Sequence, residues 1–329
     1  MKMGNYSIFV GTVGQGLNIS SDSGDTWTKI RNPMPSESNI RALRTYPDNP
    51  HRVLAGSDGL GLFRTEDNGL TWDSVDSPFS DLQVWSVAVD PGNPDTIFAG
   101  TRPEGFRSRD GGKSWDKLDM GVNMDCPIGT PRTTNIIVDP RDSRTVWAGI
   151  EVDGMYKSLD GGDSWLHLPD LGPDPFHGDI HGMALRTGDN PAFYCTSPFG
   201  IATSNDEGES WDYHYFPKFS EADARSYCRG MVIKADDPST MFVGNGDFIP
   251  GVTGAVQVTR DGGQSWEKAD LPVEPNSVVY WLANNPEMPN VIAAASLFGY
   301  VYVSEDGGNS WSKLQKEFGE IRALAVTPN

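Results

Sequence analysis

The chain has 329 residues and a net charge of −19, from 45 acidic and 26 basic residues. A surface of this sign repels phosphate backbones and anionic membranes, so we expect neither a nucleic-acid nor a membrane partner. The three cysteines, Cys126, Cys195 and Cys228, form no even disulfide framework. Because residues 1–6 lead into an apolar strand at 7–10 without a hydrophobic signal region, the sequence predicts a cytoplasmic protein.

An eight-residue motif, Ser/Thr-x-Asp-x-Gly-x-Ser/Thr-Trp, recurs along the whole chain, and we call each copy a box. The seven boxes are residues 20–27, 65–72, 108–115, 158–165, 204–211, 259–266 and 304–311. Successive box Asp residues are separated by 43 to 55 residues, which is the length of a four-stranded propeller blade. The repeat predicts an all-β, seven-bladed β-propeller that occupies residues 1–329 as a single domain.

One period is easiest to follow from residue 84 to residue 118. Apolar runs bounded by turn residues predict strand A at 84–89, strand B at 96–100, strand C at 105–108 and strand D at 115–118. The box then forms the hairpin between strands C and D. The residues before the first box Asp and after the last one add up to one further period. We therefore expect residues 321–326 to pair beside residues 7–10 and close the ring.

Each box has a structural explanation that requires no ligand. An Asp at a hairpin tip accepts backbone N–H groups, Gly supplies a positive φ, and the Ser or Thr hydroxyl ties the flank. The Trp that follows presses its apolar face into the blade. The run Asp22-Ser23-Gly24-Asp25 lacks the loop length and final Glu of an EF-hand. The boxes are thus predicted to stabilise the blades rather than to bind metal.

These boxes resemble the Asp-box, or BNR, repeats of sialidases, sortilin-type receptors, some xyloglucanases and a photosystem II assembly factor. The resemblance covers essentially the whole chain and implies the propeller fold. It implies little about activity, because the same repeat occurs in enzymes and in binding scaffolds. A true sialidase is disfavoured, since sialidases have six blades and a Phe/Tyr-Arg-Ile-Pro segment, whereas this chain has only Lys29-Ile30-Arg31-Asn32-Pro33.

Variation between blades is concentrated in a few long connections. In a propeller, the D-to-A links and B–C loops lie at one end of the ring, the loop face, and the A–B turns and boxes lie at the other, the box face. The long links are residues 119–133, 169–179 and 213–227, and one B–C loop, 245–254, is also long. Long loops on a rigid scaffold commonly carry function, so we expect the site on the loop face.

Alignment of the A strands on their following turns puts one residue per blade at the channel mouth. These residues are Arg322, Arg41, Trp85, Thr134, His181, Arg229 and Tyr280. Guanidinium groups bind carboxylates in a fixed geometry, so the three Arg predict an anionic ligand such as an acidic small molecule or a sugar. Trp85, Tyr280 and Arg132 of the first long link complete the expected binding set. The alternative is that these Arg pair with Asp58, Glu104 and Glu151 of the B–C loops.

The segment from His177 to His181 carries the second signal. If it is extended, His177, Asp179 and His181 point the same way. With His214 or Cys228 of the next blade, this trio could hold a divalent metal. The alternative is a polar pocket without metal. No cofactor is required by the sequence.

The same region supplies candidates for catalysis. His181 with Asp179 could form a base and its orienting carboxylate, while Tyr227 or Tyr280 could donate a proton. Glu151 and Glu104 could provide the paired carboxylates of glycosidic cleavage.

Besides a metal-binding enzyme that would use the cluster of His177, Asp179 and His181, two functions remain open at the level of sequence. One is a carbohydrate or small-molecule enzyme of hydrolase or lyase type. The other is a non-catalytic scaffold that binds a protein through aromatic anchors such as Phe176, Phe199, Phe248 and Phe298.

Overall fold

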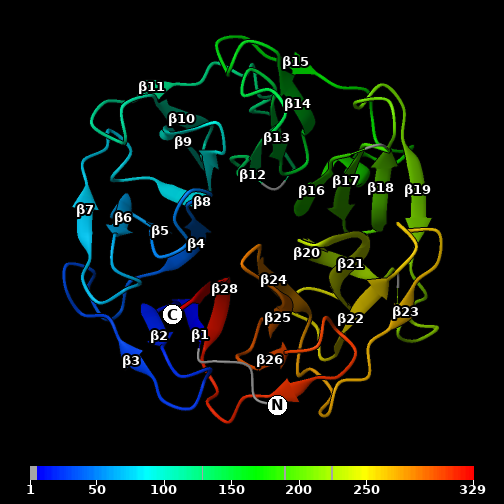
Figure 1. The fold of residues 1–329 in the computed structure, drawn as a ribbon. Coiled ribbons are helices and arrows are strands. Elements are labelled where there is room, and N and C mark those ends of the chain that lie inside the picture. The colour runs from blue at the N-terminus through cyan, green and yellow to red at the C-terminus, as the bar shows by residue number, and fades with distance from the viewer. Residues whose placement is uncertain (1–5, 128, 189, 224) are drawn as a thin grey trace.

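The structure is a computed structural model that describes residues 6–127, 129–188, 190–223 and 225–329. In these residues the chain forms seven four-stranded antiparallel sheets, arranged as blades around a central axis (Figure 1). The predicted all-β, seven-bladed propeller is confirmed. Within the described ranges the helical structure is limited to a short 3-10 turn, η1 (Pro175–Gly178). No helix in that part of the chain is long and apolar enough to span a membrane.

The strands of each blade run from the axis to the rim in chain order, except in the first blade. The innermost strands are β28 (Glu320–Pro328), β4 (Ile40–Thr45), β8 (Gln83–Asp90), β12 (Thr133–Val138), β16 (Gly182–Arg186), β20 (Tyr227–Lys234) and β24 (Val279–Asn285). The second strands are β1 (Tyr6–Val13), β5 (Val53–Ser57), β9 (Asn93–Arg102), β13 (Val146–Ile150), β17 (Ala192–Ser197), β21 (Asp237–Gly246) and β25 (Met288–Ser296).

The outer half of each blade is the hairpin that carries the box. The third strands are β2 (Leu17–Ser20), β6 (Leu62–Thr65), β10 (Gly105–Ser108), β14 (Gly154–Ser158), β18 (Gly200–Ser204), β22 (Gly254–Thr259) and β26 (Val301–Ser304). The rim strands are β3 (Thr28–Lys29), β7 (Asp73–Val75), β11 (Asp116–Lys117), β15 (Leu166–His167), β19 (Asp212–Tyr215), β23 (Glu267–Lys268) and β27 (Ser312–Lys313). The rim strands are shorter than the sequence suggested, since the box Trp of the third blade precedes β11 instead of starting it.

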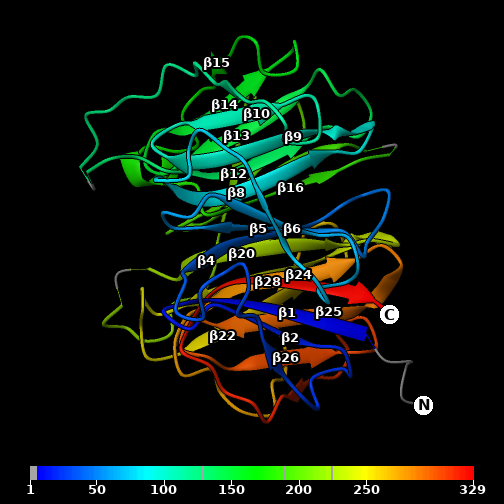
Figure 2. The same ribbon diagram turned by 90° about the vertical axis from the view of Figure 1, so that its left-hand side faces the viewer.

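Strand β28 from the end of the chain closes the first blade. It pairs antiparallel with β1, and the register runs from Tyr6 opposite Pro328 to Val13 opposite Glu320. The predicted pairing of residues 321–326 with 7–10 is therefore confirmed. Figure 2 shows β28 and β1 side by side in the side view of the ring.

The third box shows how the motif fastens its hairpin. The Asp110 carboxylate accepts the backbone N–H of Ser114 at 2.9 Å and the Ser114 hydroxyl at 2.6 Å. The Ser108 hydroxyl donates to Asp110 at 2.8 Å and accepts the Gly112 N–H at 2.8 Å. These hydrogen bonds, those from Ser114 foremost, lower the pKa of Asp110 to about 2. Both oxygens of the Asp110 carboxylate therefore accept hydrogen bonds from the same hairpin, which agrees with a structural role.

The apolar cores lie between neighbouring blades. Trp115 of the third box, for example, packs edge-on against Phe79 of the preceding link, with ring centroids 5.0 Å apart. Phe79 is fully buried in the cluster that joins the second and third blades. Burial of one such side chain stabilises the fold by about 1.5–3 kcal/mol. The ring is therefore held together through the seven interfaces between sheets.

Cationic side chains of the third strands also cross from one blade to the next. Arg64 donates to the carbonyl of Gly111 in the following box at 3.0 Å. Arg107 donates to the carbonyl of Gly161 at 2.5 Å and to the Asp163 carboxylate at 2.7 Å. The Arg107 side chain is only 4% exposed, although that of its partner Asp163 is 58% exposed.

We expect Arg107→Met to lower the free energy of unfolding by about 1–3 kcal/mol, because it removes a nearly buried guanidinium that donates hydrogen bonds to Gly161 and Asp163 of the next blade. Arg109→Met is the matched control. Arg109 contacts the same Asp163 carboxylate at 2.7 Å, but its side chain is 49% exposed, so its loss should cost about 0.5 kcal/mol or less. Urea unfolding curves of both variants measure the difference. Equal midpoints for the two variants would contradict the assigned role of Arg107.

Candidate functional site

The channel mouth is formed by β-bulges that occur at the same height along the propeller axis in the innermost strands. The pairing register shifts by one residue in six of the described innermost strands, and the extra residue in each is Arg41, Trp85, Thr134, Arg229, Tyr280 or Arg322. A bulge re-aims the side chain of its extra residue. His181, the seventh predicted residue, directly precedes β16 and donates its backbone N–H to the Thr196 carbonyl at 2.9 Å. The structure thus brings the predicted mouth residues to one level of the ring.

Tyr280 lies between two guanidinium groups on one side of the mouth. The guanidinium carbon of Arg229 lies 4.2 Å from the Tyr280 ring centroid, and that of Arg322 lies 4.6 Å from it. Both Arg also donate to the Tyr280 hydroxyl, Arg322 at 2.7 Å. Burial alone would raise the pKa of Tyr280, but the two positive charges outweigh it and the pKa is lowered.

Trp85 forms the equivalent stack on the other side of the mouth. The guanidinium carbons of Arg41 and Arg132 lie 4.4 Å and 4.5 Å from the Trp85 ring centroid. Arg41 is ion-paired with Asp58 at 2.6 Å, and Arg132 is ion-paired with Glu151 at 2.5 Å. Two aromatic rings, each between two Arg, therefore face the axis.

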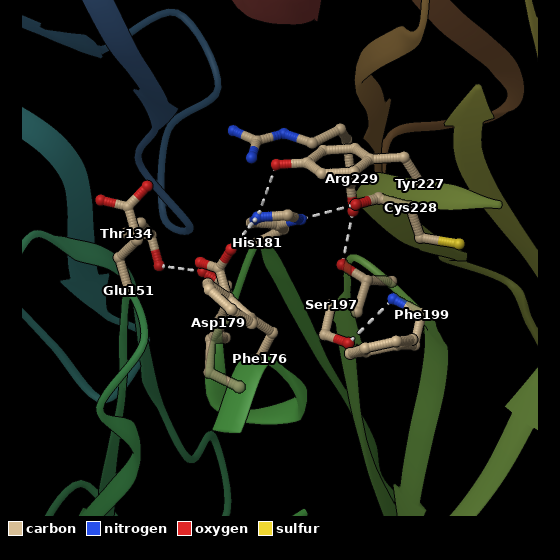
Figure 3. Close-up of polar contacts among 12 residues, drawn as sticks. Thr134, Glu151, Phe176, Asp179, His181, Ser197, Phe199, Tyr227, Cys228 and Arg229 are labelled. Atoms are coloured by element: carbon tan, nitrogen blue, oxygen red, sulfur yellow. Dashed lines mark hydrogen bonds and ion pairs between the residues drawn. The ribbon is translucent and has the colours of Figure 1, made fainter. Parts of the chain in front are cut away.

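Asp179, His181 and Tyr227 lie together beside Arg229, as Figure 3 shows. His181 Nε2 lies 3.1 Å from Asp179 Oδ2 and 3.3 Å from the Tyr227 hydroxyl. His181 Nδ1 lies 2.6 Å from the Cys228 carbonyl oxygen, so it carries the proton in that contact. The His181 side chain is fully buried. It can therefore act on a ligand only by positioning Asp179 or Tyr227.

Arg229 is the cation of the mouth that has no carboxylate partner. Arg41, Arg132 and Arg322 are each ion-paired, Arg322 with Glu320. Within the described residues no ion pair involves Arg229, although only 8% of this residue is exposed. Its charge instead acts at longer range on Asp179 and Glu151. The predicted pairing of the mouth Arg with acids of the B–C loops thus holds for Arg41 with Asp58 and not for Arg229.

The pKa values of the two carboxyl groups in the mouth move in opposite directions. Burial, reinforced by the negative charge of Asp179, raises the pKa of Glu151 to about 7 against the opposing effect of Arg132. Burial also acts to raise the pKa of Asp179, but contact with His181 and the charges of Arg229 and Arg132 outweigh it, and the pKa is lowered. Asp179 Oδ1 is buried and accepts no hydrogen bond from the described residues. Glu151 Oε2 is also buried, and its partner is Arg132 Nε at 2.5 Å.

The predicted metal set of His177, Asp179, His181 and His214 is not brought together. Residues 175–178 form η1 instead of an extended strand, so His177 turns away from His181 and stacks on Phe199 at 4.3 Å. Its Nε2 contacts the Tyr215 hydroxyl at 3.1 Å. His214 packs against Phe216 in another cluster. Across the described ranges no group of three or more His, Cys, Asp or Glu has a geometry that could hold a metal ion.

The second predicted carboxylate, Glu104, also lies apart from the mouth. It forms an ion pair with Lys117 of the rim strand β11, so Glu151 and Glu104 do not form a pair. Sequence reasoning missed Glu320, the partner of Arg322, and Arg102, whose charge acts on Glu151. A signal for Glu320 was present, since it lies two residues before Arg322 in the same strand.

Exposed aromatic side chains lie in or beside the loops around the mouth. Phe248 is 58% exposed, Tyr215 54%, Phe298 45% and Phe176 36%. Phe199, also expected as an anchor, is half-buried between His177 and the guanidinium of Arg225, which lies 4.2 Å from its ring centroid. The loop face therefore combines a charged centre with an apolar periphery.

Three comparisons relate the chain to known proteins. A family model described as Sortilin-Vps10 (sortilin, neurotensin receptor 3) matches residues 15–126. A probable oligoxyloglucan-reducing end-specific xyloglucanase of Neosartorya fischeri is 26% identical over 248 residues, which cover 59% of this chain and 28% of that protein. The chain thus spans less than a third of the length of the curated relative.

The fold is shared with several solved structures, of which three are compared. The GH74 enzyme of Niastella koreensis superposes with a TM-score of 0.65 at 16% identity, over 93% of this chain and 46% of that chain. YCF48 of Cyanidioschyzon merolae gives 0.64 at 17% identity, over 90% of this chain and 97% of that chain. A YCF48 structure with a bound D1 peptide gives 0.60 at 17% identity, over 91% of this chain and 87% of that chain. At these identities the likeness concerns the fold alone.

Proposed function

We propose, from the premise that this chain is a BNR-like Asp-box β-propeller, that it is a carbohydrate-active hydrolase for an acidic oligosaccharide. The observation that carries the proposal is the pair of opposite pKa shifts at Glu151 and Asp179 in an arginine-lined mouth. Two carboxyl groups whose environments separate their pKa values are the usual acid and base of glycoside hydrolysis.

In this proposal Glu151 is the general acid. With a pKa of about 7 it retains its proton at mildly acid pH and gives it to the glycosidic oxygen as the bond to the anomeric carbon breaks. Asp179, which stays ionised, takes a proton from the attacking water or attacks the anomeric carbon itself. Asp179 lies beside the buried His181 ring, with its Oδ2 3.1 Å from His181 Nε2.

Arg229 determines the charge of the ligand. Burial acts to lower the pKa of Arg229, but Tyr280, Tyr227, Asp179 and Glu151 outweigh it and the pKa is raised, so the guanidinium stays charged and a ligand carboxylate could form the direct contact that it lacks among the described residues. Arg322 and Tyr280 hold Arg229 in place through the shared Tyr280 hydroxyl. A uronate unit would therefore place its carboxylate against Arg229 and its ring beside the aromatic stacks.

The similarity to a xyloglucanase supports the hydrolase class, because it extends over 59% of this chain. It does not specify the substrate, since this chain spans 28% of that protein. The preference for an acidic sugar rests on Arg229 alone.

A second candidate function is non-catalytic recognition of a protein segment on the loop face. The exposed Phe248, Tyr215 and Phe298 around the mouth favour it, because aromatic anchors dominate protein interfaces. YCF48, which shares the fold, has been solved with a D1 peptide. A carboxylate of the bound segment would then contact Arg229 in place of a uronate.

The pH profile of turnover tests the hydrolase proposal. We expect kcat/KM on oligouronides to fall about tenfold per pH unit above about 7, as Glu151 loses its proton. On the acid side, activity should persist to below the ordinary Asp pKa of about 4, because the pKa of Asp179 is lowered. A reducing-sugar assay of oligouronide cleavage across the pH range measures the acid and alkaline sides of this profile. Neutral xyloglucan oligosaccharides are assayed in parallel for comparison. Binding of oligouronides without turnover at any pH would favour the second candidate.

A further inference from the structure

A cavity lies on the propeller axis toward the box face. Its volume is about 510 Å³, and its walls are the later residues of the innermost strands together with their A–B turns, including Pro47, Pro91 and Pro286. The innermost strands surround the axis in Figure 1. A volume of this size is typical of small-molecule sites, which span about 300–1,000 Å³.

Arg44 stands alone among apolar residues in this cavity. It lies three positions after Arg41 in β4. The equivalent residues of the other innermost strands are all small or apolar: Ala88, Ile137, Ala184, Val232, Ala283 and Ala325. One level of the channel thus carries a single guanidinium against an otherwise apolar wall.

Arg44 has no partner for its charge. No hydrogen bond or ion pair to its side chain is present within residues 6–127, 129–188, 190–223 and 225–329. The side chain is accessible to solvent in the channel, but the surrounding walls desolvate it and lower the pKa of the guanidinium. The other charged residue of the lining is Glu287 of an A–B turn, which is exposed. A solvent-exposed guanidinium without a carboxylate partner can bind the carboxylate of a ligand that enters the cavity.

The lining limits the ligand to one negative charge on an apolar body. One free cation, with Glu287 in the same lining, matches a monoanion and disfavours polyanions such as nucleotides. Leu43, Val87 and Trp281 contribute apolar wall, which stabilises a ligand by removing its apolar surface from water.

We propose that the axial cavity is a binding site for a small organic monoanion, with its carboxylate on Arg44 and its apolar body along the channel. The lining lies toward the box face from the mouth: it includes the bulged residues Trp85 and Thr134, whereas Arg41, Arg229, Tyr280 and Arg322 are not part of it. Trp85 contacts both regions, because it is also stacked between Arg41 and Arg132.

Isothermal titration of the whole chain with 3-phenylpropionate tests the proposal, and 3-phenylpropan-1-ol serves as the uncharged probe. We expect the acid to bind and the alcohol to bind roughly tenfold more weakly or not at all, because only the acid engages Arg44. Arg44→Met should weaken the acid roughly 10- to 100-fold and leave the alcohol unchanged. Arg322→Met, at the mouth, should change neither affinity.

Several results would overturn the proposal: no binding of the acid at millimolar concentration, equal binding of acid and alcohol, or an unchanged affinity in Arg44→Met. A loss caused by Arg322→Met instead of Arg44→Met would assign the anion to the mouth. Circular dichroism and thermal unfolding verify that Arg44→Met is folded. If Arg44→Met is not folded, the difference in affinity between the acid and the alcohol on the unaltered protein still tests the proposal. Arg44→Lys, which keeps the positive charge, then serves as the variant.

Discussion

Glu151→Gln is expected to lower kcat on an acidic oligosaccharide about 10²- to 10⁴-fold, the range that a positioned general acid contributes. Gln is nearly isosteric and can still accept a hydrogen bond from Arg132, which lies 2.5 Å from the carboxylate in the unaltered protein. It cannot release a proton at the pH at which Glu151, with its pKa of about 7, can. KM should change little, because the contact to the ligand carboxylate is made by Arg229.

Two controls separate chemistry from structure in this experiment. Glu104→Gln alters the carboxylate one blade away, which pairs with Lys117 at the rim, and it should keep full turnover. The Glu151→Gln variant should also lose the decline of activity above pH 7, because the group that titrates there is gone. An unchanged kcat, or an unchanged alkaline limb, would remove Glu151 from the mechanism.

Arg229→Met is expected to raise the Kd for an oligouronide about 10- to 100-fold, because a charged hydrogen bond contributes about 1.5–3 kcal/mol. The loss should be larger than for Arg322→Met, since Arg322 is already neutralised by Glu320. Arg229→Lys should not restore binding, because an ammonium cannot reproduce the stack on Tyr280 at 4.2 Å.

The ligand itself provides the control for this variant. A reduced oligosaccharide, in which the carboxylate has become a hydroxymethyl group, should bind the unaltered protein and Arg229→Met equally. This comparison holds even if the variant is less stable, because it rests on the ratio of two ligands on one protein. If the unaltered protein binds the reduced and the acidic forms with the same affinity, Arg229 does not select charge.

The fold was predictable because local and global signals agree. Each box contains its own turn chemistry, as the hydrogen bonds of Asp110 show, and its spacing counts the blades. The level of the mouth was also predictable, because every innermost strand ends at a recognisable turn. The strand register alone shows why these residues lie at the mouth: a bulge leaves Arg41 and Tyr280 without a partner in the neighbouring strand.

The partners of the mouth residues could not be predicted, because they come from separate segments. Arg132 precedes β12 and Glu151 follows β13, and sequence spacing does not show that they meet. The expected metal trio failed because η1 interrupts the extended strand that the alternation assumed. Arg44 had a readable signal in the sequence, because it is a lone charge among aligned apolar residues.

The pairing of β28 with β1 also has a consequence for the order of folding. Six blades consist of strands that follow one another directly in the chain, so each can form from local hairpins. The first blade needs a strand that is more than 300 residues away from its partners. Contacts of such sequence separation carry a large loop-closure entropy and form slowly. We therefore expect the pairing of β28 with β1 to be the last step of folding as the protein emerges from the ribosome. The same step places Arg322 beside Tyr280.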